Sequence, residues 1–256
     1  MENYKEAEKT IEGSQNIWIF PSENLPDSIP ASLALFYTLK KLSKNVNLFL
    51  ESFPKNIEFL VPSLDNINYP GEFIISIKNS NEDISQLYYE KNENGLKLFF
   101  KIKKGIIKKE NISFDWTWGK PDLIITIGFK KINEINPPHH FLYLNSEGSG
   151  GQKIPILNID AQNKNQKFGK INLIDQDSTI TEITTQLIKS IDENLFEENI
   201  STCLLTGFIL ISENFSKPKN LPQIFERVVF LIKKQGSWQK VKRFVGEGRW
   251  QAEPEQ

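Results

Sequence analysis

Cysteine, histidine and long apolar runs are all scarce in this sequence of 256 residues. The one cysteine, Cys203, excludes an internal disulfide and any zinc site that needs several cysteines, and its apolar surroundings favour a buried thiol. The two histidines, His139 and His140, are adjacent, so few imidazoles are present to ligate a metal. No run approaches the roughly 18 apolar residues of a membrane-spanning helix, and we therefore expect no membrane partner.

Neither sign of charge is in excess. The chain has 31 Lys and Arg against 32 Asp and Glu, which gives a formal net charge of -1. This balance argues against nucleic-acid or membrane binding through the overall field of the protein, so a basic site has to be local. The start of the chain, MENYKEAEKTIEGSQ, is polar and acidic, which is not typical of a secretory signal or a transit peptide. We expect a cytoplasmic protein in which residues 1–13 are a polar N-terminal extension.

Short apolar runs alternate with amphipathic segments along most of the chain. Runs of strand length lie at residues 16–20, 45–51, 122–128, 141–145, 154–160 and 203–211. Apolar residues at helical spacing lie at residues 32–42, 178–191 and 220–236. Apolar strands that alternate with helices predict an α/β domain with a doubly wound, mainly parallel sheet. We place this single domain at residues 14–245 and a C-terminal tail at residues 246–256.

Residues 73–114 follow a different period. In LKLFFKIKK, residues 96–104, lysines alternate with the apolar side chains of Leu96, Leu98, Phe100 and Ile102. Together with ISQLYYE before it and KNENG between, this alternation predicts an inserted antiparallel β-hairpin. The lysines on its other face either bind a polyanion or protect an exposed edge strand against aggregation.

Several stretches follow one another in an order that is known from a family of phosphoesterases. They are IWIFPSENLPDSIPASLALFYTLKKLSKNV, PDLIITIG, ILNIDAQNKNQKFGKINLID, STITEITTQLI and ISTCLLTGFI. In this order they resemble the N-terminal domain of the DHH phosphoesterases, most closely the oligoribonuclease and phosphoadenosine-phosphate phosphatase branch. The resemblance covers about residues 14–245. Its most specific part is the ungapped stretch 158–175, with Asn165, Phe168, Gly169 and Asn172 in register.

The resemblance implies a two-metal site in active members of the family. These bind two manganese or magnesium ions, and a metal-bound hydroxide attacks phosphorus. Their ligands come from a His-x-x-x-Asp-x-Asp motif, an aspartate that ends a later strand, the Asp-His-His signature, and an aspartate after a Thr-Gly strand. In register with these motifs, the vestigial positions of the substrate cleft are Pro21, Leu25, Asp27, Gly128, Asp160, Ala161, Gln162 and Ile211.

Most of these positions have lost their metal ligand. Only Asp27 and Asp160 keep a carboxylate, and the aspartate at the place of Asp160 chiefly orients its neighbours in the family. A register shifted by two residues places Glu23 at the histidine and Ile29 at the second aspartate, which does not restore the site. Two dications need several converging carboxylates and imidazoles. We therefore expect no metal cofactor and no catalytic residue, with both aspartates acting as helix-capping or loop-organising groups.

The C-terminal segment offers a different kind of site. Active relatives carry a second, substrate-binding domain, and we expect this domain to be absent and residues 216–250 to form the last helix pair. Nine Lys and Arg stand there against two Glu. Candidate contacts for RNA or a protein are Lys233, Lys234, Trp238, Lys240, Lys242 and Arg243. The alternative is that the aromatic residues pack the helix onto the sheet and the lysines are solvated.

Three functions fit these observations. The leading hypothesis is a catalytically silent DHH-like protein, a pseudoenzyme that serves as an interaction module for a protein partner or a related active subunit. The second is an active phosphoesterase that hydrolyses short oligoribonucleotides or nucleotide phosphates with a rebuilt site, which would use Asp27, Asp160 and the paired histidines. The third is metal-independent binding of a nucleotide or RNA. The neutral cleft residues favour the first, and they predict that the loop at residues 21–30 partly fills the cleft.

Overall fold

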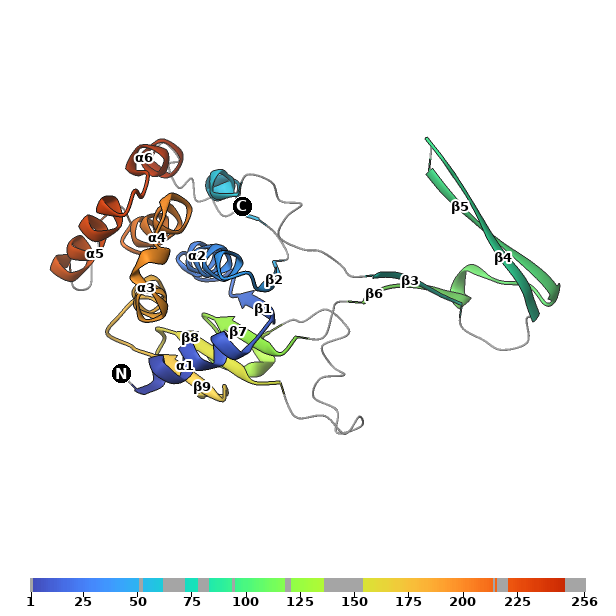
Figure 1. Ribbon diagram of the computed structural model, residues 1–256, viewed down its shortest axis with the longest axis horizontal. Coiled ribbons are helices and arrows are strands. Elements are labelled where there is room, and N and C mark those ends of the chain that lie inside the picture. Colours follow the sequence, from blue (N-terminus) through green and yellow to red (C-terminus); the bar gives the residue numbers. More distant parts are fainter. Residues whose placement is uncertain are drawn as a thin grey trace, which may run out of the picture. The chain divides into compact units, whose positions relative to one another are not determined.

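A computed structural model gives the structure of the chain. It describes residues 2–50, 53–61, 72–77, 83–93, 95–117, 121–135, 154–213, 215 and 221–246. The chain divides into two compact units. The main unit comprises residues 1–69 and 120–256, and the inserted unit comprises residues 70–119 (Figure 1).

The main unit is built around a five-stranded parallel sheet with the order β2-β1-β7-β8-β9. Its strands are β1 (Asn16–Pro21), β2 (Asn45–Leu48), β7 (Leu123–Ile127), β8 (Ile156–Asp160) and β9 (Ile171–Ile174). Every pairing in this sheet is parallel. Strand β2 lies on one side of β1, whereas β7, β8 and β9 follow one another on its other side. The strand order therefore reverses between β1 and β7. The mainly parallel α/β sheet that the sequence predicts is confirmed.

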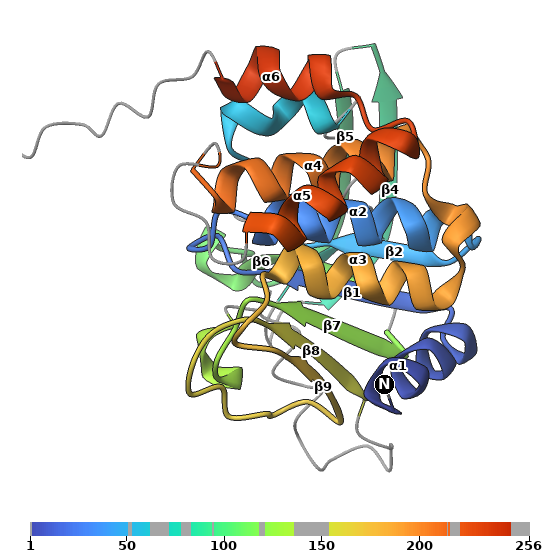
Figure 2. The ribbon, with the colours of Figure 1, turned by 90° about the vertical axis from the view of Figure 1, so that its left-hand side faces the viewer.

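Helices cover one face of this sheet (Figure 2). They are α1 (Glu2–Gly13), α2 (Ser28–Lys41), α3 (Ile180–Ile191), α4 (Glu198–Ile211), α5 (Leu221–Lys233) and α6 (Trp238–Gly246). Short 3-10 helices lie at η1 (Lys55–Leu60), η3 (Lys109–Asn111), η4 (Ile132–Glu134) and η6 (Glu193–Leu195). Helix α2 packs on β1 and β2, α3 on β8, and α1 on β9 and α3, while α4 lies against α2 and α3 and carries α5 and α6 on its outer side. Among the described helices none has both the length and the apolar character needed to cross a bilayer.

The expectation of a strand at residues 203–211 is wrong, because this segment belongs to helix α4. All residues from Ile200 to Ile209 are buried, since α4 is enclosed by α2, α3, α5 and α6. A helix that is buried on all sides has no polar face, and its sequence then lacks the helical period. A uniformly apolar run of this kind does not distinguish a strand from a buried helix.

Residues 2–13 are part of the fold rather than an extension of it. They form α1, in which Ala7 and Ile11 are fully buried in the main core and Tyr4 packs against that core. These three side chains follow the i, i+3, i+7 spacing of a narrow apolar stripe. The side-chain amide of Asn3 also donates a hydrogen bond to the Asn172 carbonyl oxygen on the outer strand β9 (3.1 Å).

The inserted unit contains two antiparallel strand pairs. Strand β3 (Glu72–Ile77) pairs with β6 (Ile112–Thr117), and β4 (Asp83–Asn92) pairs with β5 (Gly95–Lys104). The second pair is the β-hairpin that the alternating sequence predicts, and it is confirmed. The expected strand at 141–145, the glycine-rich segment 147–151 and both histidines lie outside the described residues.

Close packing between α3 and α4 generates a testable prediction at Gly207. Alanine is usually favoured over glycine inside a helix by about 1 kcal/mol. Here an added Cβ would collide with Oγ1 of Thr181 and stand 3.2 Å from its Cγ2. We expect Gly207→Ala to lower the free energy of unfolding by about 1–3 kcal/mol, as overpacking does, measured by urea denaturation.

A double-mutant cycle with Thr181→Ala separates this collision from a general effect on the helix. Removal of both γ atoms leaves only the Cβ of residue 181, at 3.4 Å from the added methyl group. Gly207→Ala should then become neutral or stabilising in the Thr181→Ala background. An equal loss of stability in both backgrounds would show that the contact between α3 and α4 is not the cause.

Candidate functional site

The candidate site lies at the carboxyl ends of the strands, where the strand order reverses. Pro21 ends β1, Gly128 follows β7 and Asp160 ends β8, so the structure brings three of the predicted positions to one edge of the sheet. Open α/β sheets place their ligands at this point. A pocket of about 270 Å³ opens beside these strand ends, and its lining includes Leu25, Asp27, Ala161, Gln162, Ile180 and Ile211. All eight predicted cleft positions therefore lie in this region.

Gly128 shows how the end of β7 is occupied. Its backbone has a φ of +82°, in the left-handed region that favours glycine. A Cβ at this position would stand 2.9 Å from Cδ1 of Leu25 and 3.2 Å from Cδ1 of Ile180. The space that a side chain would need is already filled by apolar atoms. Leu25 comes from the loop after β1, so the predicted partial filling of the cleft by this loop is confirmed.

The Asp160 carboxylate is held by donors from its own loop. Oδ1 accepts hydrogen bonds from the backbone N–H groups of Ala161 (2.9 Å) and Gln162 (3.2 Å), and from the Gln162 side-chain amide (3.1 Å). Oδ2 accepts a 2.7 Å hydrogen bond from the side-chain amide of Asn165. Both oxygens are thus engaged in local contacts, and the side chain is fully buried. Such a carboxylate organises a loop and is not presented to a ligand.

The residues that carry the family resemblance stabilise the same loop. Asn158 on β8 donates from its side chain to Oδ1 of Asn165 (3.1 Å), which also accepts from the Lys167 backbone N–H (2.7 Å). The side chain of Asn172 on β9 accepts a hydrogen bond from the Gly169 N–H and donates one to the Gly169 carbonyl oxygen. A Cβ on Gly169 would stand 2.6 Å from the Ile171 carbonyl oxygen, so no other residue fits. These residues therefore have a structural role that needs no metal.

Asp27 is the second buried carboxylate of the site. Its Oδ2 accepts hydrogen bonds from the backbone N–H (3.1 Å) and the hydroxyl of Thr181 (3.3 Å) in the first turn of α3. This satisfies one of the N–H groups that a helix leaves unpaired at its start. Burial raises the pKa of Asp27 from 3.8 to about 6, and the hydrogen bonds from Thr181 oppose this shift only in part.

The donor set does not fit the two metal ions that the family resemblance implies. Within the described ranges, no group of three or more His, Cys, Asp or Glu side chains is placed to hold a metal ion. Of the two carboxylates at this edge, Asp160 has both oxygens bound internally and Asp27 is bound to α3. A pair of dications needs more anionic and imidazole donors than this edge supplies.

The basic candidates at the C-terminus are only partly available. Lys234 forms an ion pair with Glu193 (3.4 Å), and Lys240 forms one with Glu198 (2.6 Å). Trp238 opens α6 and stays 37% exposed. The side chains of Lys233, Lys242 and Arg243 are exposed, whereas those of Phe244 and Trp250 lie outside what the structure describes.

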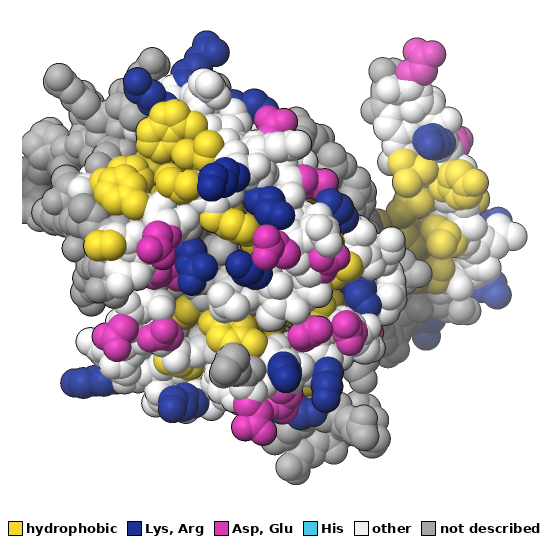
Figure 3. Space-filling model, turned by 60° about the vertical axis from the view of Figure 1, so that its left-hand side comes forward, with side chains coloured by type: hydrophobic (Ala, Val, Ile, Leu, Met, Phe, Trp, Pro, Cys, Tyr) yellow, Lys and Arg dark blue, Asp and Glu magenta, His cyan; other side chains and the backbone are white. Residues whose placement is uncertain are grey.

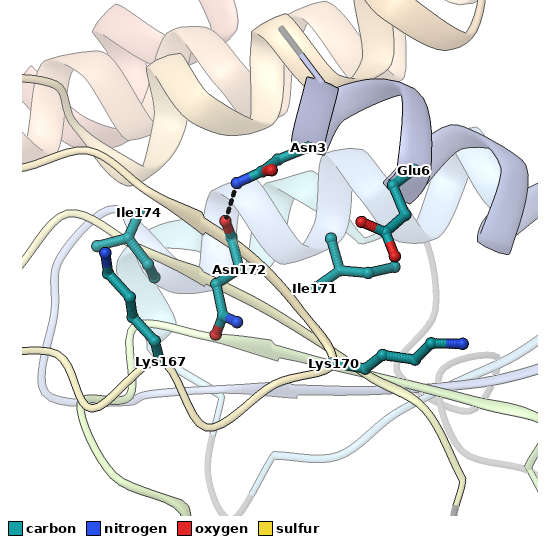
Figure 4. A pocket seen from close by; sticks show the side chains of 7 residues that line it. All are labelled: Asn3, Glu6, Lys167, Lys170, Ile171, Asn172 and Ile174. Carbon is teal, nitrogen blue, oxygen red and sulfur yellow. Dashed lines mark hydrogen bonds between the residues drawn. The ribbon is translucent and has the colours of Figure 1, made fainter.

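A second hollow of about 240 Å³ lies between α1 and β9, and no motif in the sequence predicts it. Its lining includes Lys167 and Lys170, which would suit an anion. Figure 4 shows that these two side chains extend in different directions, so their ammonium groups do not converge. The hollow therefore lacks the arrangement of a phosphate site.

Comparison with known proteins supports the fold. No family model matches the sequence, and no curated protein matches it. Solved structures do match, among them the crystal structure of an exopolyphosphatase-related protein from Bacteroides fragilis, with a TM-score of 0.66 at 16% sequence identity. The match covers 98% of this chain but 62% of that one, so the chain spans less than two thirds of the other protein. At this identity the likeness shows a shared α/β fold.

The raised pKa of Asp27 predicts how stability depends on pH. The folded state holds the proton up to about pH 6, whereas the unfolded state loses it near pH 3.8. The unfolded state binds fewer protons in this window, so this group's contribution to stability is present below about pH 4 and is lost as pH rises through 6. A shift of about two units corresponds to at most about 3 kcal/mol.

Asp27→Asn should remove this loss of stability at rising pH, because the amide does not ionise and its oxygen still accepts hydrogen bonds from Thr181. We expect the variant to gain stability over the wild type between pH 4 and pH 7, measured as the urea midpoint at each pH. Glu12→Gln, at an exposed position on α1, is the matched control for the loss of one negative charge. If the wild type instead becomes more stable relative to the variant as the pH rises, α3 stabilises the Asp27 anion.

Proposed function

We propose that this protein is a catalytically silent relative of the DHH phosphoesterases, and that it serves as a protein-binding module. One observation carries the proposal. The position after β7, where the family places a metal-binding aspartate, is a left-handed glycine whose side-chain space is filled by Leu25 and Ile180. The metal-binding carboxylate is absent at Gly128, and the space that its side chain would need is filled. A single substitution of Gly128 by aspartate therefore does not recreate the site.

The rest of the cleft supports the same proposal. Ala161 and Gln162 stand where the signature has its two histidines, and Gln162 uses its side-chain amide to bond the Gly128 carbonyl oxygen (2.9 Å). Ile211 lines the pocket at the place of the last aspartate. A metal-bound hydroxide cannot be generated without the metal ions, and the two carboxylates described at the strand ends, Asp27 and Asp160, are both held by internal hydrogen bonds.

A phosphate ligand in the cleft is not favoured either. The described lining of the pocket contains one carboxylate, Asp27, and neither lysine nor arginine. Phosphate groups are usually held by arginine or lysine side chains, or by free N–H groups at a helix start. At α3 the backbone N–H of Thr181 is bound by Asp27, and the N-cap Thr179 exchanges hydrogen bonds with Glu182.

Helix α5 offers the surface on which we place the protein partner. Phe225, Val229 and Ile232 follow i, i+4, i+7 spacing and are each between 44% and 49% exposed. Figure 3 shows hydrophobic side chains gathered on this side of the main unit. Two of the three are aliphatic, so they do not stack on bases. The row fits an apolar surface of another protein, which is a common use of an exposed amphipathic helix.

Metal titration tests the silent cleft directly. We expect calorimetry with Mn²⁺ and with Mg²⁺ to show no saturable binding, and we expect no hydrolysis of short oligoribonucleotides or short polyphosphates above the level of an Asp27→Asn, Asp160→Asn double variant. The double variant is the matched control because it removes both carboxylates that remain at the strand ends. Two-site binding of Mn²⁺ together with turnover that the double variant loses would overturn the proposal.

A further inference from the structure

The β4–β5 hairpin separates its side chains into two faces of opposite character. Leu87 pairs with Phe100 and Tyr89 with Leu98, so these four side chains share one face. A register shift around Ser85 places Ile84 opposite Ile102 on the same face. We call this the apolar face, and it consists of Ile84, Leu87, Tyr89, Leu96, Leu98, Phe100 and Ile102.

The opposite face, which we call the lysine face, carries Lys97, Lys101 and Lys103. Tyr88 and Phe99 also lie on it, with their rings stacked at a centroid distance of 4.8 Å. The apolar face itself has a lysine only near its ends, Lys91 beside the turn and Lys104 at the base. The centre of the apolar face is therefore uncharged.

The apolar face is largely uncovered. Leu87, Tyr89 and Leu96 are each at least 60% exposed, and Ile84 and Leu98 are close to 40% exposed. Aromatic side chains bury on the order of 150–250 Å² when fully covered, and leucine and isoleucine bury less. Five side chains that are about half exposed thus offer at most roughly 500 Å² per copy and about 1,000 Å² for two copies, the lower limit of a specific interface. An isolated two-stranded hairpin is also only marginally stable in water, so burial of its apolar face by another chain would stabilise it.

A second copy of the same hairpin is the cover that this face fits best. The centres of two apolar faces are uncharged and can approach without like-charge repulsion, and leucine, isoleucine and aromatic side chains interdigitate when two sheets stack about 10 Å apart. The lysine face carries Lys97, Lys101 and Lys103 against one carboxylate, Glu90, so the same arrangement through it would bring two positively charged faces together. The charge distribution thus allows self-association through one face and opposes it through the other, as a two-fold interface requires.

We propose that two copies of this chain associate through their hairpins, apolar face against apolar face, to form a homodimer with a four-stranded sandwich. The proposal concerns the inserted unit alone and does not depend on a silent cleft. Metal binding would overturn the proposed function without affecting this dimer, and a monomeric protein would overturn the dimer without affecting the proposed function.

Two neighbouring tyrosines provide a matched test of the face. Tyr89 lies on the apolar face and Tyr88 on the lysine face, and both are more than half exposed. In sedimentation velocity of the full chain over a range of concentrations, we expect the wild type and Tyr88→Lys to be dimers. Tyr89→Lys combined with Leu87→Lys should weaken the dimer by at least about 100-fold, since two lysines per copy would be buried at the centre. Circular dichroism of each variant checks that it is folded.

Chemical crosslinking gives a second measurement that leaves the charge unchanged. Cys203 is buried, and burial also raises the pKa of its thiol, so an introduced cysteine is the reactive one. A short thiol-to-thiol crosslinker should join two copies of Leu98→Cys and fail to join two copies of Phe99→Cys on the other face. A wild type that is monomeric at all concentrations overturns the proposal. The proposal is also overturned if Tyr88→Lys weakens the dimer as much as the Leu87→Lys, Tyr89→Lys double variant does. That result would place the contact on the lysine face or on the strand edges.

Discussion

The start of helix α3 is the point on which the arrangement of the cleft depends. The Asp27 carboxylate binds the backbone and the hydroxyl of Thr181, and Gly207 on α4 lets the same threonine approach closely from the other side. One residue earlier, Ile180 packs with Leu25 into the space beside Gly128. The position of α3 therefore decides both which helices can pack together and how much space remains at the strand ends. In this chain Ile180 helps to fill the space beside Gly128, while a pocket of about 270 Å³ stays open next to it.

The two aspartates that remain at this edge are tolerated for different physical reasons. Asp160 is fully buried, and four hydrogen bonds from its loop replace the water that its carboxylate loses. Asp27 is also buried, and its raised pKa is the sign that the hydrogen bonds to its carboxylate compensate this burial incompletely. In a site without dications, each additional carboxylate would be a further unpaired buried charge, which costs several kcal/mol. Neutral residues at the other positions are consistent with the silent cleft that we propose.

The parts of the fold that the sequence predicts are those with a local signal. Alternation over residues 96–104 is enough for the hairpin, and short β-branched runs are enough for β1, β7 and β8. Helix α4 carries no helical signal in its sequence, because a helix enclosed on all sides has no polar face. The contact of Leu25 with Gly128 joins positions about 100 residues apart. The neutral residues at the cleft positions predict that the cleft is partly filled, whereas the left-handed turn at Gly128 and the place of Ile180 follow only from the fold.

The exposed apolar side chains of α5 and of the hairpin are not part of the pocket lining at the strand ends. The cleft at the strand ends is small and contains one carboxylate, whereas exposed apolar side chains line α5 and the hairpin. Burial of apolar area contributes about 25 cal/mol per Å², so covering these side chains with another protein chain would be favourable. They also lie on regular elements, at helical spacing on α5 and on one face of β4 and β5. Regular spacing fixes the geometry of a contact surface, which is what a protein partner can recognise.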